Sequence, residues 1–564
     1  MSRARRAGSS ALAALALACT SAGACVFIAP FPELAPDPPG EGGGGGGGDA
    51  SGAGGGGGEG QDSCVPRAQT ACYDGPHGTA GVGRCKAGVA TCNDDGTEVG
   101  ACAGAILPGF EGCGADEDTN CDGRTGCTGA PVQSVPLGGT GDQRGLAVAV
   151  GQRGEGQDDV LVAGQISGTA AFGEGSSEEL GEIGHMDCFL ASFTPDRRFG
   201  FSHRFADCVA RGLAIAGRDV VLVGSASGDV DFGGGALARD VDSEDVVIAR
   251  FDAAGRHLFS RRFGDDASQS AAAVAVDAAG SALVTGRFRG VLDLGERGDG
   301  ERITLESRGG SDVFLAKLDA QGQVLWAKQL GDAEHQEGTG VAVDRAGNIL
   351  LVGSFAGTID FVEEQIHGFA KSDMFIAKLT PEGDYVWSLT ASATNAAEAR
   401  GVAVDSIGNV FVTGSFRGAV TFGEQLRRNE GDADILLVRL DANGVPQWSQ
   451  AFGDASDQLG ASVAVDLDGD VVVTGSFTGN LDFEGAAHPG TGGVDAFVVK
   501  LDPQGGRRWS RSFGDAREQE GAAVAVDLLG NSWVTGHFSG SIDLGNGALS
   551  NLGAADAFLV QIAP

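Results

Sequence analysis

Hydrophobic and polar positions alternate with a period of two through most of the chain, and the alternating segments recur. The stretch NVFVTGSFRGAVTFG (409–423) is repeated in similar form as NILLVGSFAGTIDF from Asn348 and as DVVVTGSFTGNLDF from Asp470. Alternation of period two predicts half-buried β-strands, and the glycines between the segments predict tight turns. Recurrence of the same strand set indicates a repeat architecture, so the repeats are counted before any motif is interpreted.

Two markers count the repeats independently. A glycine ends a short valine-rich element at Gly164, Gly224, Gly286, Gly353, Gly414, Gly475 and Gly536. An aspartate opens an apolar strand at Asp187, Asp245, Asp312, Asp373, Asp434, Asp495 and Asp556. Both series have seven members, and the glycines lie 60 to 67 residues apart.

Each repeat contains four strand signals separated by turn residues. In the sixth repeat the strands begin at Ser462, Asp470, Asp495 and Arg507. Short turns such as Asp-Pro-Gln-Gly, with aspartate first and glycine last, are typical of hairpins that end in a left-handed residue. Four antiparallel strands form one blade of a β-propeller. The sequence therefore predicts an all-β fold, a seven-bladed β-propeller of four-stranded blades over residues 131–564.

The two ends of this region complement one another. The seventh repeat stops after DAFLVQI (556–562) and lacks a fourth strand. Upstream of the first repeat, QSVPLGGTGDQRG (133–145) aligns with WSRSFGDAREQEG (509–521) of the sixth. We expect the N-terminal strand to complete the last blade, which closes the ring and removes both exposed sheet edges.

Phenylalanine, tryptophan and aspartate each recur at one equivalent position in several repeats. We predict that the phenylalanines pack between blades, and that the tryptophans do the same rather than form a platform for sugars. We predict that the strand-opening aspartates cap the N–H groups of turns; a ring of carboxylates that binds cations is the alternative. The aromatic sets are Phe288, Phe355, Phe416, Phe477 and Phe538, and Trp326, Trp387, Trp448 and Trp509.

The N-terminus has the features of an export signal. Three arginines precede the apolar run ALAALALAC, which is too short to span a bilayer. The end of this segment, Ala-Gly-Ala-Cys25, resembles a bacterial lipobox, so we predict a signal peptide over 1–24 and lipidation at Cys25. Cys19 is the second candidate, and ordinary cleavage without lipid is the third. Residues 25–62 are glycine-rich and predict a flexible linker.

Residues 63–130 form a cysteine-rich segment. Eight cysteines in a short exported stretch predict a disulfide framework whose pairing the sequence leaves open. Within it, oxygen-bearing side chains recur every second residue before Gly123, as in loops that bind calcium. The glutamate that would complete such a loop is absent, so an acidic turn is the alternative to a calcium site. The four candidate ligands are Asp116, Asp118, Asn120 and Asp122.

The propeller region contains two further cysteines, Cys188 and Cys208. Cys188 follows the aspartate that opens the third strand of the first repeat, and Cys208 follows the fourth strand. Antiparallel pairing of these strands brings the two cysteines to the same end, so we predict a disulfide between them.

The repeats resemble the bacterial SBBP-type seven-bladed β-propeller family. The resemblance is carried by G-x-A-V-A-V-D-x-x-G-N-x-x-V-T-G-S-F-x-G, followed by D-x-F-x-x-K-L-D and a strand with tryptophan. Repeats 3 to 7 match well, whereas repeats 1 and 2 have lost parts of the pattern. Together with the acidic cysteine-rich segment, the chain is similar to surface lipoproteins of myxobacteria. The resemblance implies an exported propeller and no particular activity.

Charge limits the possible partners. The formal net charge is −37, which repels nucleic acid and anionic membrane surfaces. Contact with a membrane is therefore expected only through the lipid anchor. Cations, basic proteins and neutral glycans remain as partners, and we expect a monomer.

No catalytic constellation is found in the sequence. The eight histidines lie out of register, no phosphate-binding or dinucleotide motif is present, and few charged residues break the repeat outside repeats 1 to 3. Loops on a rigid scaffold commonly bind ligands, and the longest connection between second and third strands carries an insertion in the third repeat. Its candidate binding residues are Glu296, Arg297, Asp299, Glu301 and Arg302.

These observations predict a non-catalytic propeller that binds a protein or a glycan. It would be exported by a Gram-negative bacterium and either anchored at the outer membrane or cell surface or secreted. A propeller enzyme of the lyase or glycosidase class, and a passive structural surface protein, are the alternatives.

Overall fold

The computed structural model describes residues 64–73, 75, 79–97, 99–121, 123–152, 158–172, 186–194, 198–238, 243–362 and 364–564. Throughout these ranges the regular structure is β-strand, without a helix. Accordingly, the described part of the chain has no helix that could cross a membrane. The predicted signal peptide, the linker, Cys25 and Asp122 lie outside the described residues.

Each of the seven repeats forms one antiparallel blade, with its first strand innermost. Blade 1 contains β4 (Gln143–Gln152), β5 (Asp158–Ile166), β7 (Asp187–Phe193) and β8 (Phe199–Phe205). Blade 2 contains β9 (Cys208–Ala216), β10 (Asp219–Ala226), β11 (Asp245–Phe251) and β12 (His257–Phe263). Blade 3 contains β13 (Gln269–Val276), β14 (Ala282–Phe288), β17 (Asp312–Leu318) and β18 (Val324–Leu330). Blade 4 contains β19 (Gln336–Val343), β20 (Ile349–Phe355), β23 (Asp373–Leu379) and β24 (Tyr385–Thr390).

The remaining blades follow the same order. Blade 5 contains β26 (Ala396–Val404), β27 (Val410–Arg417), β30 (Asp434–Leu440) and β31 (Pro446–Phe452). Blade 6 contains β32 (Gln458–Val465), β33 (Val471–Phe477), β36 (Asp495–Leu501) and β37 (Arg507–Phe513). Blade 7 contains β38 (Gln519–Val526), β39 (Ser532–Phe538), β42 (Asp556–Ile562) and, from the other end of the propeller, β3 (Pro131–Gly138). The predicted seven-bladed fold is confirmed.

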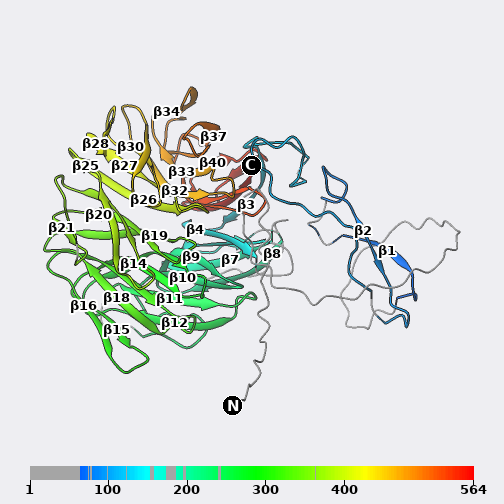
Figure 1. Cartoon of the computed structure of the whole chain (residues 1–564), viewed down its shortest axis with the longest axis horizontal. Helices are drawn as coiled ribbons and strands as arrows, with labels where there is room; N and C mark the ends of the chain where they lie inside the picture. Colours follow the sequence, from blue (N-terminus) through cyan, green and yellow to red (C-terminus); the bar gives the residue numbers. More distant parts are fainter. Residues whose placement is uncertain are drawn as a thin grey trace, which may run out of the picture. The chain divides into compact units, whose positions relative to one another are not determined.

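The innermost strands contact one another in a closed circuit. β4 lies beside β9, and β13, β19, β26, β32 and β38 follow in turn until β38 meets β4 again. The colours of Figure 1 run round the ring in the same order, from cyan at β4 through green and yellow to red at β40. Layers of buried apolar side chains fill the space between adjacent blades, including the five predicted phenylalanines.

Ring closure takes place at β3. This strand pairs antiparallel with β42 from Pro131↔Ile562 to Leu137↔Ala557. Its Leu137 side chain is fully buried, and Gln133 Nε2 donates a hydrogen bond of 2.5 Å to Gln561 Oε1. The predicted N-terminal closing strand is therefore confirmed. The short strand β6 (Ala171–Phe172) continues the sheet beyond β3.

Among the described residues, five blades carry an additional two-stranded hairpin between their second and third strands. In blades 3 and 6 this hairpin contacts the outermost strand of its own blade and that of the preceding blade. The pairs are β15 (Val291–Glu296) with β16 (Arg302–Glu306), β21 (Thr358–Asp360) with β22 (Gln365–His367), β28 (Ala419–Phe422) with β29 (Gln425–Arg428), β34 (Asn480–Phe483) with β35 (Ala486–Pro489), and β40 (Ser541–Asp543) with β41 (Ala548–Ser550). The short strand β25 (Ser392–Ala393) pairs with β28.

Aspartates fix the turns and loops of each blade. Asp502 Oδ1 accepts N–H bonds from Gln504 and Gly506, at 2.9 and 2.8 Å, around a glycine with φ +92°. Among the strand-opening aspartates, Asp495 accepts the N–H of Thr491 at 2.7 Å, and Asp434 accepts that of Glu430 at 3.2 Å. Burial raises the pKa of Asp434 to about 6. The predicted capping role is confirmed for these carboxylates.

Two of the four tryptophans join neighbouring blades through hydrogen bonds. Trp387 Nε1 donates to the carbonyl of Ala442 in blade 5 at 3.2 Å, and Trp448 Nε1 donates to that of Pro503 in blade 6 at 3.0 Å. At the ring closure, the N–H groups of Thr128 and Gly129 donate to Pro564 O. These bonds support the structural interpretation of the tryptophans over a sugar platform.

Cys188 and Cys208 form a disulfide, with their Cα atoms 5.0 Å apart. Because Cys208 begins β9, the bond links blade 1 to blade 2 rather than lying within one blade. In five other blades this position holds a glutamine whose side chain fastens the preceding loop, as Gln458 does with Asp454. The disulfide therefore replaces a hydrogen-bonded joint in the divergent pair of blades.

Replacing both Cys188 and Cys208 with alanine should lower the free energy of unfolding by about 2–4 kcal/mol, because the cross-link restricts the unfolded chain. Peptide mapping of the non-reduced protein should recover the two cysteines in one linked peptide. Free thiols at both positions, or a link from either one to the cysteine-rich segment, would contradict the pairing.

Candidate functional site

The start of each innermost strand supplies the functional positions of the propeller. In most blades the sequence at the start of this strand is Gln-x-Gly or Gln-x-Ala. The glutamine and the small third residue both stabilise the fold. Gln458 Nε2 donates to Thr478 O at 3.0 Å, which joins the incoming loop to the second strand. Gly521 is packed so closely that a Cβ atom there would lie 2.2 Å from Thr474 Oγ1 of blade 6. Only the middle residue is free to vary.

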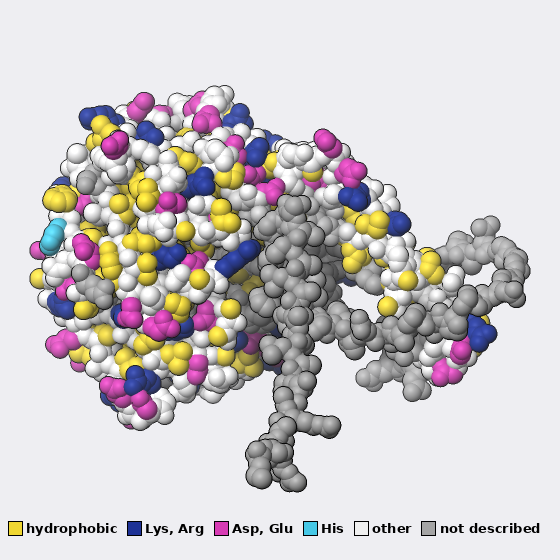
Figure 2. All heavy atoms as spheres, in the orientation of Figure 1, with side chains coloured by type: hydrophobic (Ala, Val, Ile, Leu, Met, Phe, Trp, Pro, Cys, Tyr) yellow, Lys and Arg dark blue, Asp and Glu magenta, His cyan; other side chains and the backbone are white. Residues whose placement is uncertain are grey.

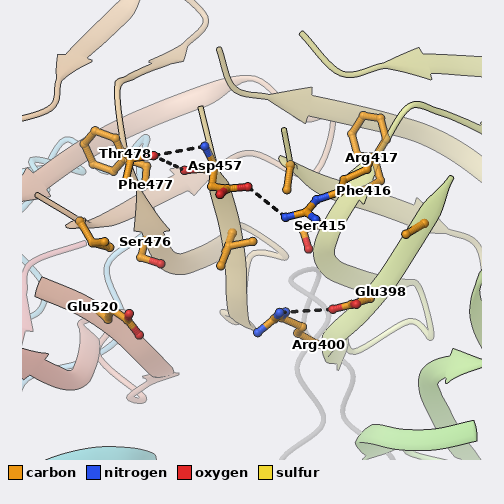
Figure 3. Close-up of a pocket in the computed structure, with 14 residues that line it drawn as sticks. Glu398, Arg400, Ser415, Phe416, Arg417, Asp457, Ser476, Phe477, Thr478 and Glu520 are labelled. Carbon is orange, nitrogen blue, oxygen red and sulfur yellow. Dashed lines mark hydrogen bonds and ion pairs between the residues drawn. The ribbon is translucent and has the colours of Figure 1, made fainter. Parts of the chain in front are cut away.

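A cavity of about 370 Å³ opens where these middle residues meet in blades 5, 6 and 7. Figure 3 shows its labelled side chains converging from several strands. Blade 5 contributes Glu398 and Arg400 from β26, blade 6 contributes Leu459 from β32, and blade 7 contributes Glu520 from β38. The cavity therefore lies beside the circuit of innermost strands, at the mouth of the central channel.

Two ion pairs form part of the cavity wall. Arg400 Nη2 lies 3.3 Å from Glu398 Oε2, and Arg417 Nη2 lies 3.2 Å from Asp457 Oδ1 (Figure 3). Arg400 occupies a β-bulge, because the pairing register of β26 and β27 shifts between Ala399 and Gly401. A bulge re-aims the extra side chain, and here it places a guanidinium on the cavity side of blade 5.

Two serine hydroxyls complete the polar lining. Ser415 and Ser476 follow the Thr-Gly of the second strand in blades 5 and 6, and they are 6% and 7% exposed. Within the described residues, neither hydroxyl has a hydrogen-bond partner in the protein. Neither hydroxyl is among the fully buried polar atoms, so both can reach the cavity and are available to a ligand or to water.

Glu520 lies in a field of mixed charge. Burial raises the pKa of its carboxyl, Arg144 and Arg400 oppose the rise, and Glu518 adds to it. The neighbouring His537 has its ring Nε2 3.1 Å from Arg144 Nη1. Burial, aided by the charge of Arg144, lowers the pKa of His537 to about 4, so its imidazole is neutral at physiological pH.

A second cavity, of about 630 Å³, lies in blades 3 and 4 at the same end of the innermost strands. Arg287, Arg289, Lys371, His335 and Glu337 are among its lining residues. Arg287 Nη1 lies 3.5 Å from Glu337 Oε2. Figure 2 shows basic and acidic side chains interspersed over the face of the ring in view, despite the large negative net charge.

The charged cavity residues were not singled out from the sequence. Glu337, Glu398 and Glu520 hold the same middle position of the innermost strand in blades 4, 5 and 7, so they do not break the repeat. Aligning the starts of the innermost strands shows these three glutamates as the acidic members of one variable position. Arg400 and His537 lie outside that position.

The candidate binding residues of the third repeat lie in the β15–β16 hairpin, which is regular rather than an open loop. Glu296 ends β15, Arg302 begins β16, and the other three residues form the turn. Their charges satisfy one another, since Arg297 pairs with both Asp299 and Glu301. Glu296 and Arg302 also line a cavity of about 350 Å³ on this hairpin.

The cysteine-rich segment is held by four disulfides, whose pairing the sequence left open. They join Cys64 with Cys92, Cys72 with Cys102, Cys85 with Cys121, and Cys113 with Cys127. A two-stranded sheet of β1 (Gln69–Cys72) and β2 (Gly88–Thr91) is its main regular structure among the described residues. The predicted disulfide framework is confirmed.

The acidic loop of this segment is organised by a buried carboxylate. Glu111, 1% exposed, accepts N–H bonds from Thr119, Asn120 and Gly126, at 2.8, 3.3 and 2.7 Å. Of the predicted calcium ligands, Asp116 is exposed, whereas Asp118 and Asn120 are buried. Asp118 Oδ2 accepts the N–H of Gly123 at 2.9 Å. This bonding gives Asp118 a role in an acidic turn, and the calcium site stays a prediction.

Comparisons with known proteins agree with a propeller. No family model matches the chain. The regulatory protein FlaEY of Caulobacter vibrioides is 28% identical over 176 residues, which are 30% of this chain and 18% of that protein. An uncharacterized WD repeat-containing protein of Acanthamoeba polyphaga mimivirus is 24% identical over 201 residues, 29% of this chain and 14% of that protein. The alignments thus span less than a fifth of either relative.

Solved structures with a similar fold include the WD40 domain of Neurospora crassa Pan2, with 11% identity and a TM-score of 0.37 over 74% of this chain and 89% of that one. The Dos1 propeller has 9% identity and a TM-score of 0.34 over 76% of this chain and 95% of that one. Puromycin hydrolase has 12% identity and a TM-score of 0.37 over 80% of this chain and 55% of that one. Values this low say nothing about activity. The strand order of the seven blades identifies the chain as a β-propeller scaffold.

Proposed function

We propose that the chain is a binding protein of the bacterial cell surface, whose propeller holds a protein or glycan ligand at the mouth of its central channel. One observation carries this proposal. The variable polar residues of several blades meet in the cavity of blades 5 to 7, on a scaffold whose other repeat positions are occupied by packing and turn residues. Binding sites are typically concave and carry a few convergent polar groups.

The N-terminal sequence supports the location. A basic, apolar and then small-residue segment ending in Cys25 fits export and lipid attachment, and residues 25–62 fit a flexible tether. The SBBP resemblance and the similarity to myxobacterial surface lipoproteins point the same way. The protein would then be monomeric, tethered at the outer membrane or cell surface, and without a nucleic-acid partner.

Retention of a surface component tests the binding function. Immobilised protein of residues 64–564 should retain a protein or glycan from an extract of the cell envelope of its host. Protein that is unfolded in urea, reduced and alkylated before immobilisation serves as the unfolded control, since it keeps the composition and charge of the chain. Equal retention by both forms, or by neither, would refute a specific binding function.

Enzymatic action in the cavity is the second candidate. It is favoured by Glu520, whose raised pKa suits a general acid, beside neutral His537. A glycosidase or lyase would release new reducing ends or unsaturated products from a retained glycan, whereas a binding protein would return the glycan intact.

Calcium binding by the acidic loop is a separate expectation. Titration calorimetry of the oxidised protein should show heat at millimolar calcium or below, and replacing Asp116 and Asp118 with asparagine should remove it. Exchange of the exposed Glu117 for glutamine is the control and should leave the heat unchanged. If the native protein takes up no calcium, the loop is an acidic turn held by Glu111.

A further inference from the structure

The cavity of blades 5 to 7 is chemically balanced. Two arginines, Arg400 and Arg417, share its lining with three carboxylates, those of Glu398, Asp457 and Glu520. Four of these five groups are already paired with each other, at 3.3 and 3.2 Å. An ionic ligand would have to compete with these internal pairs, because no cation of the lining is left without a counter-charge.

Each ion pair presents donors and acceptors side by side. The guanidinium of Arg400 offers N–H groups next to the carboxylate oxygens of Glu398, and Arg417 does the same next to Asp457. A hydroxyl group both donates and accepts, so two neighbouring hydroxyls match such a pair without disturbing its charge. Charge-assisted hydrogen bonds of this kind are roughly twice as strong as neutral ones.

The two buried serines add to this match. Ser415 and Ser476 are more than nine-tenths buried, line the cavity, and have hydroxyls without a partner in the described protein. Leu459 adds an apolar side chain to the lining. Figure 3 shows the two serines on strands of neighbouring blades, with Glu520 and Arg400 below them.

The surroundings disfavour the charged alternatives. A net charge of −37 repels polyanions such as phosphorylated or uronic-acid chains. A cationic ligand would find a single unpaired carboxylate of the lining, that of Glu520, and the positive charges of Arg144 and Arg400 near it oppose the approach of a cation.

We infer that this cavity binds a neutral, hydroxyl-rich ligand, a sugar unit of an uncharged glycan. The inference rests on the proposed binding function and narrows its ligand to one chemical class. The cavity volume of about 370 Å³ lies within the range of small-molecule sites and suits one or two sugar rings.

Saturation-transfer NMR and titration calorimetry on residues 64–564 test the inference. The probes are neutral trisaccharides (maltotriose, cellotriose and chitotriose), with trigalacturonic acid and trilysine as the anionic and cationic arms. At least one neutral trisaccharide should bind, and neither charged probe should. The Ser476→Val variant, which removes a hydroxyl and fills space, should weaken binding about tenfold.

Two further variants keep the test specific. Ser532→Val makes the same exchange at the opposite end of a second strand, where blades 5 and 6 carry Val410 and Val471, and it should leave the affinity unchanged. Glu520→Gln should change the affinity for a neutral sugar less than about threefold, since an amide still accepts and donates. The same Glu520→Gln exchange would weaken the binding of a cationic ligand more strongly, because it removes the one carboxylate of the lining that is not paired with an arginine.

The outcomes separate the inference from the proposed function. Binding of a neutral trisaccharide that Ser476→Val weakens and Ser532→Val does not would support both. Binding of trilysine or trigalacturonic acid alone would overturn the neutral class. Retention of an envelope component without binding of any trisaccharide would also overturn it, while leaving the binding function in place.

Discussion

Removal of β3 should destabilise the whole propeller. A chain that starts at Gly139 leaves β42 as an open sheet edge, although all seven residues of that strand are buried in the native ring. The loss includes the burial of Val135 and Leu137 and the hydrogen bonds of the β3–β42 ladder. At about 1.5–3 kcal/mol for each large side chain, plus the ladder bonds, the loss is on the order of 5 kcal/mol.

A chain that starts at Ala130 is the matched control, because it lacks the cysteine-rich segment but keeps β3. Urea denaturation should show a clearly lower midpoint for the chain without β3, and size-exclusion chromatography should show association through the open edge. Equal midpoints for the two chains would mean that β3 does not close the ring.

Neutralising a buried aspartate should have the second largest effect. In blade 4, Lys378 Nζ lies 2.9 Å from Asp344 Oδ2, and both side chains are less than a tenth exposed. The Asp344→Asn exchange retains an oxygen for the turn but leaves the ammonium of Lys378 buried without its counter-charge. Removal of one partner of a buried pair typically costs about 3–5 kcal/mol.

The effect should depend on pH in a defined direction. Burial of Asp344 opposes its ionisation, but hydrogen bonds from Lys378 and Asn348 outweigh this and hold its pKa below the ordinary value. A lowered folded-state pKa gives stability that is present above the unfolded-state pKa, near 4, and is lost as the pH falls through the folded-state pKa. The difference between wild type and Asp344→Asn should therefore be full at pH 7 and shrink below pH 4.

Asp384→Asn is the matched control in the same blade. Asp384 pairs with Lys328 at 3.3 Å, but its side chain is 70% exposed. Exposed pairs contribute under about 1 kcal/mol, so this variant should unfold almost as the wild type does. Similar losses for the two variants would contradict the assignment of the buried pair.

The fold could be predicted from the sequence because each repeat carries the same pattern of strand and turn residues. Asp502 and Gly505 mark a turn that the structure forms, and the alignment of residues 133–145 with 509–521 identifies the closing strand. The hairpins between second and third strands were not predicted, because segments such as 358–367 are short and differ in length and pattern from blade to blade. The hairpins of blades 3 to 6 contact neighbouring outer strands, a long-range packing that the local pattern does not show.

The candidate site could be predicted only in part. Glu398 and Glu520 are ordinary charged residues in their own repeats and line one cavity only when blades 5 to 7 pack side by side. The bulge that carries Arg400 recurs after the Gln-x-Gly element in the other blades, but the residue on it varies, and it is Ala461 in blade 6 and Ala522 in blade 7. The strand pattern alone does not show that this extra residue turns toward a cavity. In the sequence, the turn of the β15–β16 hairpin stood out more clearly than the cavity residues because it is an insertion. In the structure, however, its Arg297 pairs with Asp299 and Glu301.

Hydrogen–deuterium exchange decides between these two locations. Exchange is compared for residues 64–564 with and without the neutral trisaccharide or envelope fraction that the protein retains. Slower exchange in peptides that cover Glu398 to Arg400, Ser476 and Glu520, without change in the hairpin residues 296–302, is the result expected for a site at the channel mouth. Protection confined to residues 296–302, with the peptides of blades 5 to 7 unchanged, would contradict it.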